Sequence, residues 1–282
     1  MGFLGNRQAN AYWLLVAPLL VLVIAFYAWP VLGILWLSLT DPEPGLGNYA
    51  RLFVGGSLAR ILWTTFRICL ITTLISVAVG YVVAYSMTHL GRRERSWMMA
   101  LVLVSLWVSV LVRAFAWLTL LGRNGLVNGA LMGIGVVDEP VALVRNELGV
   151  LIGMVHYMIP YAVLPILANM QGIDQRVISA SRGLGAGALY TFTRIYLPLS
   201  APGIFAAGIL VFIISLGFYV TPAILGGGRV LMVAEYVSVQ VLVTVQWGVA
   251  SMLATTLLIG VFALMFILSR FMRIGELFGA RA

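Results

Sequence analysis

The chain has 282 residues, of which 62% are hydrophobic and 9% are charged, and its formal net charge is +8 at pH 7. A water-soluble globular domain is only about one half apolar and about one quarter charged, so the composition excludes that class and predicts an integral membrane protein. Six spans of about 20 residues with short connections would use nearly the whole length. We therefore expect residues 1–282 to form a single all-α transmembrane domain.

Apolar runs predict six transmembrane helices. The first run, 12–39, is too long for a cleaved signal peptide and lacks a small-residue cleavage site. Pro18 and Pro30 lie inside it, which a bundle tolerates where neighbouring groups satisfy the freed carbonyls. The other predicted spans are about 61–88, 97–121, 148–170, 200–219 and 247–269, with a semi-apolar, re-entrant segment before the last.

The arginines predict the orientation of these spans. All seventeen basic residues are arginine. With both termini in the cytoplasm, five arginines are external, two fall within spans, and ten are cytoplasmic: Arg7, Arg92, Arg93, Arg95, Arg176, Arg182, Arg194, Arg270, Arg273 and Arg281. The opposite orientation would reverse the positive-inside bias. Because the charge collects at one membrane face, it indicates topology and lipid contact, and no nucleic-acid partner is expected.

Residues 171–199, between the fourth and fifth predicted spans, are too polar for lipid and should lie in water at the cytoplasmic face. Their distinctive side chains are three small residues, an arginine, a glycine and an Ile-x-Leu-Pro ending, namely Ser179, Ala180, Ser181, Arg182, Gly185, Ile195, Leu197 and Pro198. This order predicts a short helix, a tight glycine turn and a second short helix that the proline ends. A helix–turn–helix at a membrane face is a docking shape.

These residues resemble the cytoplasmic loop of the permease subunits of bacterial ATP-binding-cassette importers. The pattern of that family is Glu-Ala-Ala, three residues, Gly, nine residues and Ile-x-Leu-Pro, and the spacing here is the same. The resemblance implies that the loop inserts into a groove of a cytoplasmic ATPase and passes its motion to the membrane helices. Ser179 stands where the family usually has glutamate, which leaves open the salt bridge that the glutamate makes.

Three further runs, 48–53, 107–117 and 217–222, resemble the polyamine-type branch of these permeases. The resemblance then covers nearly the whole chain and implies a type I importer architecture with six transmembrane helices in the bacterial inner membrane. It also implies the partners. These are a second permease subunit, usually a related but different chain, two ATPase subunits that hold ATP and Mg, and a periplasmic solute-binding protein.

Several chemistries are excluded by what the sequence lacks. A phosphate-loop nucleotide site and a Schiff-base enzyme both need a lysine, and the chain has none. No Asp or Glu lies in a predicted span, whereas ion-coupled transporters usually carry one there. Cys69 has no cysteine partner, and His156, four residues before Pro160, is expected either to serve carbonyls freed by proline or to contact substrate. No catalytic, cofactor or metal constellation is visible.

Five residues are candidates for the translocation path or its gate: Arg67, Arg113, Trp117, Phe218 and Tyr219. Arg67 lies about six residues into the second span and should face the bundle or a cavity. Arg113 lies near aromatic side chains, and two roles are open for it: an interfacial anchor or a residue of the path. Phe218 and Tyr219 end the fifth span, where the resemblance implies a gate and an interfacial aromatic belt is the alternative.

The leading hypothesis is therefore the path-forming, non-catalytic subunit of an ATP-driven, binding-protein-dependent importer. Its expected cargo is a polyamine or a related amine-bearing solute, such as an opine, an amino acid derivative or an aminophosphonate. If the two arginines within spans line the path, a cation at 4 Å meets about 4 kcal/mol of repulsion at an effective dielectric of 20, which favours zwitterionic or anionic cargo. The alternatives are an ion-coupled secondary transporter and a membrane-embedded enzyme.

Overall fold

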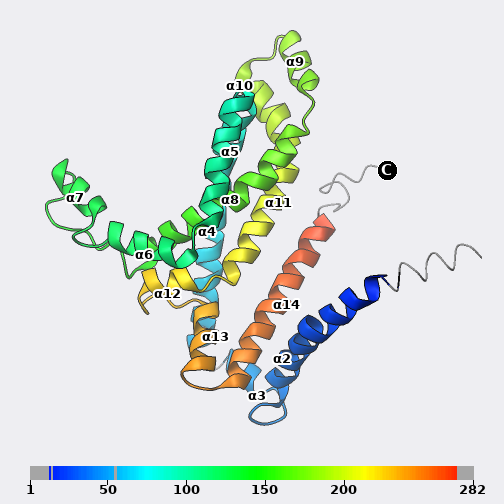
Figure 1. The fold of residues 1–282 in the computed structure, drawn as a ribbon, viewed down its shortest axis with the longest axis vertical. Helices are drawn as coiled ribbons and strands as arrows, with labels where there is room; N and C mark the ends of the chain where they lie inside the picture. Colours follow the sequence, from blue (N-terminus) through cyan, green and yellow to red (C-terminus); the bar gives the residue numbers. More distant parts are fainter. Residues whose placement is uncertain (1–12, 14, 54–55, 272–282) are drawn as a thin grey trace, which may run out of the picture. The chain divides into compact units, whose positions relative to one another are not determined.

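The described part of the chain is built from helices (Figure 1). The computed structural model describes residue 13, residues 15–53 and residues 56–271, and no strand occurs among them. Among these residues, five helices are long and apolar enough to cross a membrane, and a sixth span results if two helices that meet at a 96° bend count as one. The prediction of an all-α membrane protein with six spans is confirmed. Both termini, with Arg7, Arg273 and Arg281, lie outside the described residues.

The first of two compact units comprises Met1–Leu58 and Val237–Gly260. Its membrane span is Leu15–Thr40, which includes α2 (Trp29–Thr40) and leads to the short helix α3 (Gly47–Ala50). The Asp41 carboxylate accepts the Gly248 N–H at 2.6 Å. This bond fastens the end of the first span to the start of α14 (Trp247–Phe271), which is the sixth span.

Two spans contain a π-helical turn that ends two residues before a proline. η1 (Ile24–Ala28) precedes Pro30, and η2 (Phe192–Tyr196) precedes Pro198. In both turns the next residue donates its N–H to the carbonyl five residues earlier. A proline ring clashes with the carbonyl four residues back, and the wider turn relieves that clash. Pro198 therefore starts α11 (Leu197–Leu216), and the prediction that it ends a short helix is wrong.

The second unit comprises Ala59–Tyr236 and Val261–Ala282, and α8 (Glu147–Gln171) is its central helix. α8 packs along α11, and it approaches α4 (Ser57–His89) so closely that a Cβ on Gly80 would lie 2.8 Å from the Cβ of Ala162. Eleven buried residues of α8 are spread over the length of the helix. The core of the unit therefore surrounds this helix.

Two buried apolar clusters lie along α8. One contains Ala84, Met87, Met158, Ala162, Val163, Ile166, Leu167, Met170, Tyr196, Ala207 and Val211. The other contains Ile68, Cys69, Val150, Met154, Leu225, Val230 and Met232. The first cluster ties residues 171–199 to the membrane helices through Tyr196, and the second ties the segment after the fifth span to α4. At 0% exposure, Cys69 is a buried hydrophobe, as its apolar setting in the sequence indicates.

The third span is broken, which the sequence did not predict. α5 (Arg92–Trp107) and α6 (Val110–Leu120) replace the single helix expected over 97–121, and their axes differ by 96°. Val108 and Ser109, between them, have extended backbone with ψ angles of 128° and 137°. After α6 the chain forms α7 (Leu126–Gly133) before it enters α8.

The fifth span also ends earlier than predicted. α11 stops at Leu216 instead of 219, because Gly217 to Tyr219 leave the helix. The segment that follows, expected to be a re-entrant loop, holds two short helices, α12 (Val220–Gly226) and α13 (Val233–Leu242). Figure 1 shows α9 (Gln175–Gly183) and α10 (Ala188–Thr191) near one end of the second unit, away from α12.

Candidate functional site

The coupling segment, residues 171–199, contains the predicted helix and glycine turn. The Asp174 carboxylate caps α9 by accepting the Arg176 N–H at 2.8 Å. At the other end Gly185 has φ +85°, in the left-handed region that glycine adopts without strain. A Cβ at Gly185 would meet no heavy atom within 4 Å, so backbone conformation, rather than space, favours glycine there.

The three small residues of the segment divide between two environments. Ser181 is buried, and its hydroxyl is 3.1 Å from the Thr191 hydroxyl of α10. Ser179, Ala180 and the neighbouring Arg182 are exposed. Ser181 therefore joins the two short helices to each other, while the other three are free to meet a partner.

Exposed apolar side chains lie in the same stretch of chain as these polar ones. Within α9, α10 and the turn between them, four large apolar residues are more than one third exposed: Val177, Leu184, Leu189 and Tyr190. Leu184 is the most open, at 90% exposure. These residues were not among the predicted site residues, although apolar residues in an otherwise polar loop could have identified them. We call them the apolar docking residues.

The Ile-x-Leu-Pro ending connects the segment to the membrane helices. Ile195 is half-buried in η2, while Leu197 and Pro198 are exposed at the start of α11. Tyr196 is buried, and its ring packs edge-on against Tyr85 of α4 with the centroids 5.2 Å apart. η2 passes directly into α11, so Ala188–Leu216 is a continuous helical span.

Arg67 forms an ion pair with Glu147, the first residue of α8. The two side chains are 47% and 34% exposed, so the pair lies at an accessible end of the second unit. Glu147 is 80 residues away in the sequence and outside the predicted spans, so no carboxylate was expected to offset the charge of Arg67. The structure corrects that point, since this arginine is partnered.

Arg113 is buried in α6, at 6% exposure, and is not the interfacial anchor considered from the sequence. Its Nη2 donates to the carbonyl of Ser105 and, at 3.3 Å, to the carbonyl of Val108. The Ser105 carbonyl belongs to the last turn of α5, where helix geometry leaves it without a helical partner, and Val108 directly follows that helix. Its Cζ also lies 4.7 Å from the ring centroid of Tyr157 in α8, which is a cation–π distance.

Three rings form what we call the aromatic row: Tyr161, Tyr157 and Phe218. Tyr157 stacks on Tyr161 with centroids 5.7 Å apart, and its other ring contact is Phe218 at 4.6 Å. Phe218 lies between α11 and α12, and the next residue, Tyr219, is 42% exposed. The row therefore links α8 to the break after the fifth span.

Trp117 and His156 form a separate pair. The indole N–H of Trp117 donates to Nδ1 of His156 at 3.2 Å, and the rings meet edge-on. Nδ1 therefore does not serve a carbonyl freed by proline, which was the first interpretation from the sequence. Trp117 and Arg113 are four residues apart on α6, so both project toward α8.

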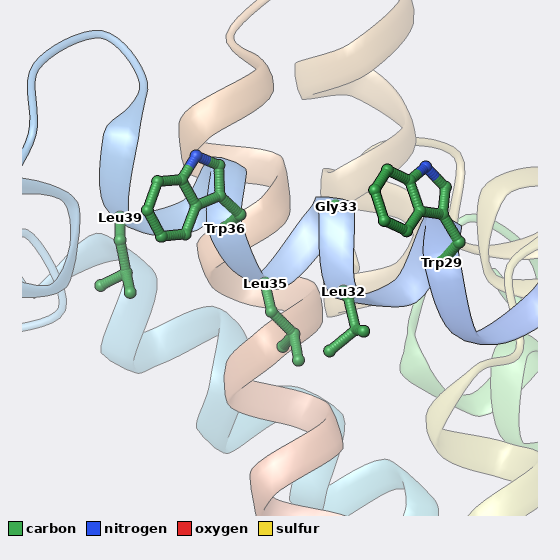
Figure 2. Close-up of a pocket in the computed structure, with 6 residues that line it drawn as sticks. All are labelled: Trp29, Leu32, Gly33, Leu35, Trp36 and Leu39. Carbon is green, nitrogen blue, oxygen red and sulfur yellow. The ribbon is translucent and has the colours of Figure 1, made fainter.

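The described residues also contain apolar hollows. One, of about 620 Å³, lies along α2 and is lined by Trp29, Leu32, Gly33, Leu35, Trp36 and Leu39 (Figure 2). Another, of about 370 Å³, lies between α4 and α11. Neither is lined by the candidate residues, and no group of three or more His, Cys, Asp or Glu in the described residues could hold a metal.

The sequence matches a family of membrane transport proteins. The model of the family described as "Binding-protein-dependent transport system inner membrane component" matches residues 76–278. The spermidine/putrescine transport system permease protein PotB of Haemophilus influenzae is 28% identical over 267 residues, which cover 92% of this chain and 88% of that protein. PotB of Escherichia coli K12 is 30% identical over 223 residues, covering 78% and 81% of the two chains.

Solved structures agree on the fold. A chain of a bacterial alginate ABC transporter, in complex with an alginate pentasaccharide-bound periplasmic protein, matches with a TM-score of 0.78 at 16% identity. The match covers 94% of this chain and 95% of that one. The family model thus covers residues 76–278, and a named permease matches 78% of the chain by sequence. The solved transporter chain shares the fold over 94% of the chain. The chain belongs to the binding-protein-dependent transport system inner membrane component family, and it is a multi-pass, non-catalytic permease subunit of an ATP-binding-cassette importer.

Proposed function

We propose that the chain, as one permease domain, encloses a solute path together with a second permease subunit of related but different sequence. The observation that carries this proposal is the continuity of η2 with α11, because Ala188–Leu216 is a single helical span that begins in the coupling segment. A rigid helix transmits displacement from one end to the other. Movement at the glycine turn would therefore reach Phe218, at the far end of α11.

The energy comes from two separate ATPase subunits, which hold ATP and Mg. They dock on the coupling segment, where the apolar docking residues offer surface to bury and exposed Arg182 offers charge. Ser179 takes the position of the usual glutamate without contributing a charge. Closure of the ATPases on ATP moves the coupling segments together and opens the path outward, and hydrolysis reverses the motion. The N and C termini then lie in the cytoplasm.

The cargo is a polyamine or a related amine-bearing solute, delivered by a periplasmic solute-binding protein. The similarity to permeases named for spermidine and putrescine supports this cargo. The ion pair with Glu147 weakens the electrostatic objection to a cation at Arg67, whereas Arg113 donates to neutral carbonyls and keeps its charge. In this proposal Phe218, Tyr219 and Trp117 form the gate, and Arg67 and Arg113 stand beside the path.

The test is solute-stimulated ATP hydrolysis by the complete importer in lipid vesicles. The complex is purified with the second permease and the ATPase, loaded with binding protein, and offered spermidine, putrescine, γ-aminobutyrate or a neutral sugar. Stimulation by the amines but not by the sugar is expected. Stimulation by the sugar alone would refute the proposed cargo, and failure of the ATPase to co-purify would refute the docking surface.

A further inference from the structure

Two helix breaks in the second unit are connected through one side chain. The first break separates α5 from α6 at Val108 and Ser109, and the second separates α11 from α12 at Gly217 to Tyr219. α12 packs against both α6 and α8. We propose that Arg113 is a positioning residue that couples the bend of the third span to the gate at Phe218. This inference rests on the proposed function, since it concerns the same path.

On one side, Arg113 holds the bend. A helix that ends at Trp107 leaves its last carbonyls without helical partners. The guanidinium reaches back from α6 and donates to two carbonyls, at Ser105 and Val108. Changing the angle between α5 and α6 would break one or both bonds. The position of the guanidinium therefore reports the angle of the bend.

On the other side, the same guanidinium supports the gate ring. Its Cζ lies 4.7 Å from the centroid of Tyr157, and the Tyr157 and Phe218 centroids are 4.6 Å apart. The Phe218 backbone N–H donates to the Ser215 carbonyl at 3.1 Å, which fixes this residue to the end of α11. A shift of the guanidinium removes the support of Tyr157 and, through it, of Phe218.

The burial of Arg113 distinguishes this role from simple capping. Its Nη1 is buried and has no hydrogen-bond partner within the described residues, which is a cost that a neutral cap would avoid. A planar cation can bond two carbonyls in its plane and still present a flat face to a ring, which neither lysine nor a neutral amide does equally well. The two functions therefore require arginine in particular.

A cysteine at Gly217 can report the gate. A Cβ there would meet no heavy atom within 4 Å, and replacing buried Cys69 with alanine removes the other thiol. In the complete importer, the rate of labelling by a membrane-impermeant maleimide should differ between the nucleotide-free and vanadate-trapped states. Arg113→Gln should reduce that difference by about fivefold, as loss of about 1 kcal/mol of coupling would. Arg123→Gln, at an exposed arginine, is the matched control.

A double-mutant cycle separates coupling from general stability. Tyr157→Leu removes the ring and should match the loss seen in Arg113→Gln, the double variant should lose no more, and Tyr157→Phe should resemble wild type. Additive losses, or equal behaviour of the Leu and Phe variants, would overturn the proposal. If Arg113→Gln does not insert into the membrane, Arg113→Lys and the comparison of Tyr157→Leu with Tyr157→Phe test the coupling instead. If spermidine stimulates the wild-type importer but these variants leave the labelling unchanged, this inference alone is refuted. If spermidine does not stimulate the wild-type importer, the proposed cargo is refuted.

Discussion

Replacing Gly185 with valine tests the coupling segment, because the backbone there has φ +85°. Valine would meet no heavy atom within 4 Å at its Cβ, so it adds backbone strain without a clash. The left-handed conformation costs an L-residue about 1–2 kcal/mol, and asparagine adopts it several times more often than other residues do. If the native turn competes with a relaxed one, this energy shifts their ratio about 5-fold to 30-fold.

We expect Gly185→Val to insert normally and to lose at least about fivefold in spermidine-stimulated ATP hydrolysis by the complete importer. Gly185→Asn should stay near wild type. Gly187→Val is the matched control, because Gly187 also has open space at its Cβ but has φ −66°. The reasoning would be refuted if Gly185→Val kept wild-type coupling, or if the two valine variants were equally impaired.

Four further predictions concern other residues of the second unit. Ser181→Ala should lower the free energy of unfolding in detergent by about 1 kcal/mol, because it leaves a buried hydroxyl partner unpaired, whereas Ala at exposed Ser179 should leave thermal unfolding unchanged. Ser179→Glu should keep the ATPase through co-purification, and its loss would contradict the proposed docking. Burial raises the pKa of the Glu235 carboxyl, so the folded state holds that proton more tightly than the unfolded state does. The free energy of unfolding should therefore fall as pH rises above the pKa of this carboxyl in the unfolded chain. Glu235→Gln should remove this fall in thermal unfolding scans. Arg67→Gln and Glu147→Gln should each change unfolding by less than about 1 kcal/mol, as expected for an exposed ion pair.

The coupling segment could be predicted from the sequence because local residues determine it. Glycine at a left-handed turn and small residues on a short helix act within a few positions, and the structure has α9 and a φ of +85° where the pattern placed them. Pro198 was misinterpreted because proline can start a helix as well as end one. Here the wider turn of η2 accommodates the proline ring, so the helix continues into α11.

The broken third span could not be predicted, for a physical reason. Residues 107–110 contain neither glycine nor proline, so no local signal opposes a continuous helix. The break is held by Arg113 of α6 and by Tyr157 of α8. α12 packs on both of these helices. Likewise, the partner of Arg67 is 80 residues away. The contacts of Arg113 with Tyr157 and of Arg67 with Glu147 form only when distant spans are brought together.

On the proposed path, the ion pair would determine how charge at this end of α4 affects the cargo. An unpaired guanidinium repels a cation at 4 Å by about 4 kcal/mol at an effective dielectric of 20, whereas Glu147 beside Arg67 cancels most of that field. Glu147→Gln exposes the positive charge and should weaken stimulation by spermidine more than by γ-aminobutyrate, while Arg67→Gln should do the opposite. Exchanging the two residues restores a neutral pair and should restore the wild-type preference. If the preference between spermidine and γ-aminobutyrate changed in neither single variant, cargo would not pass near this pair. The amine selectivity would then have to come from the binding protein.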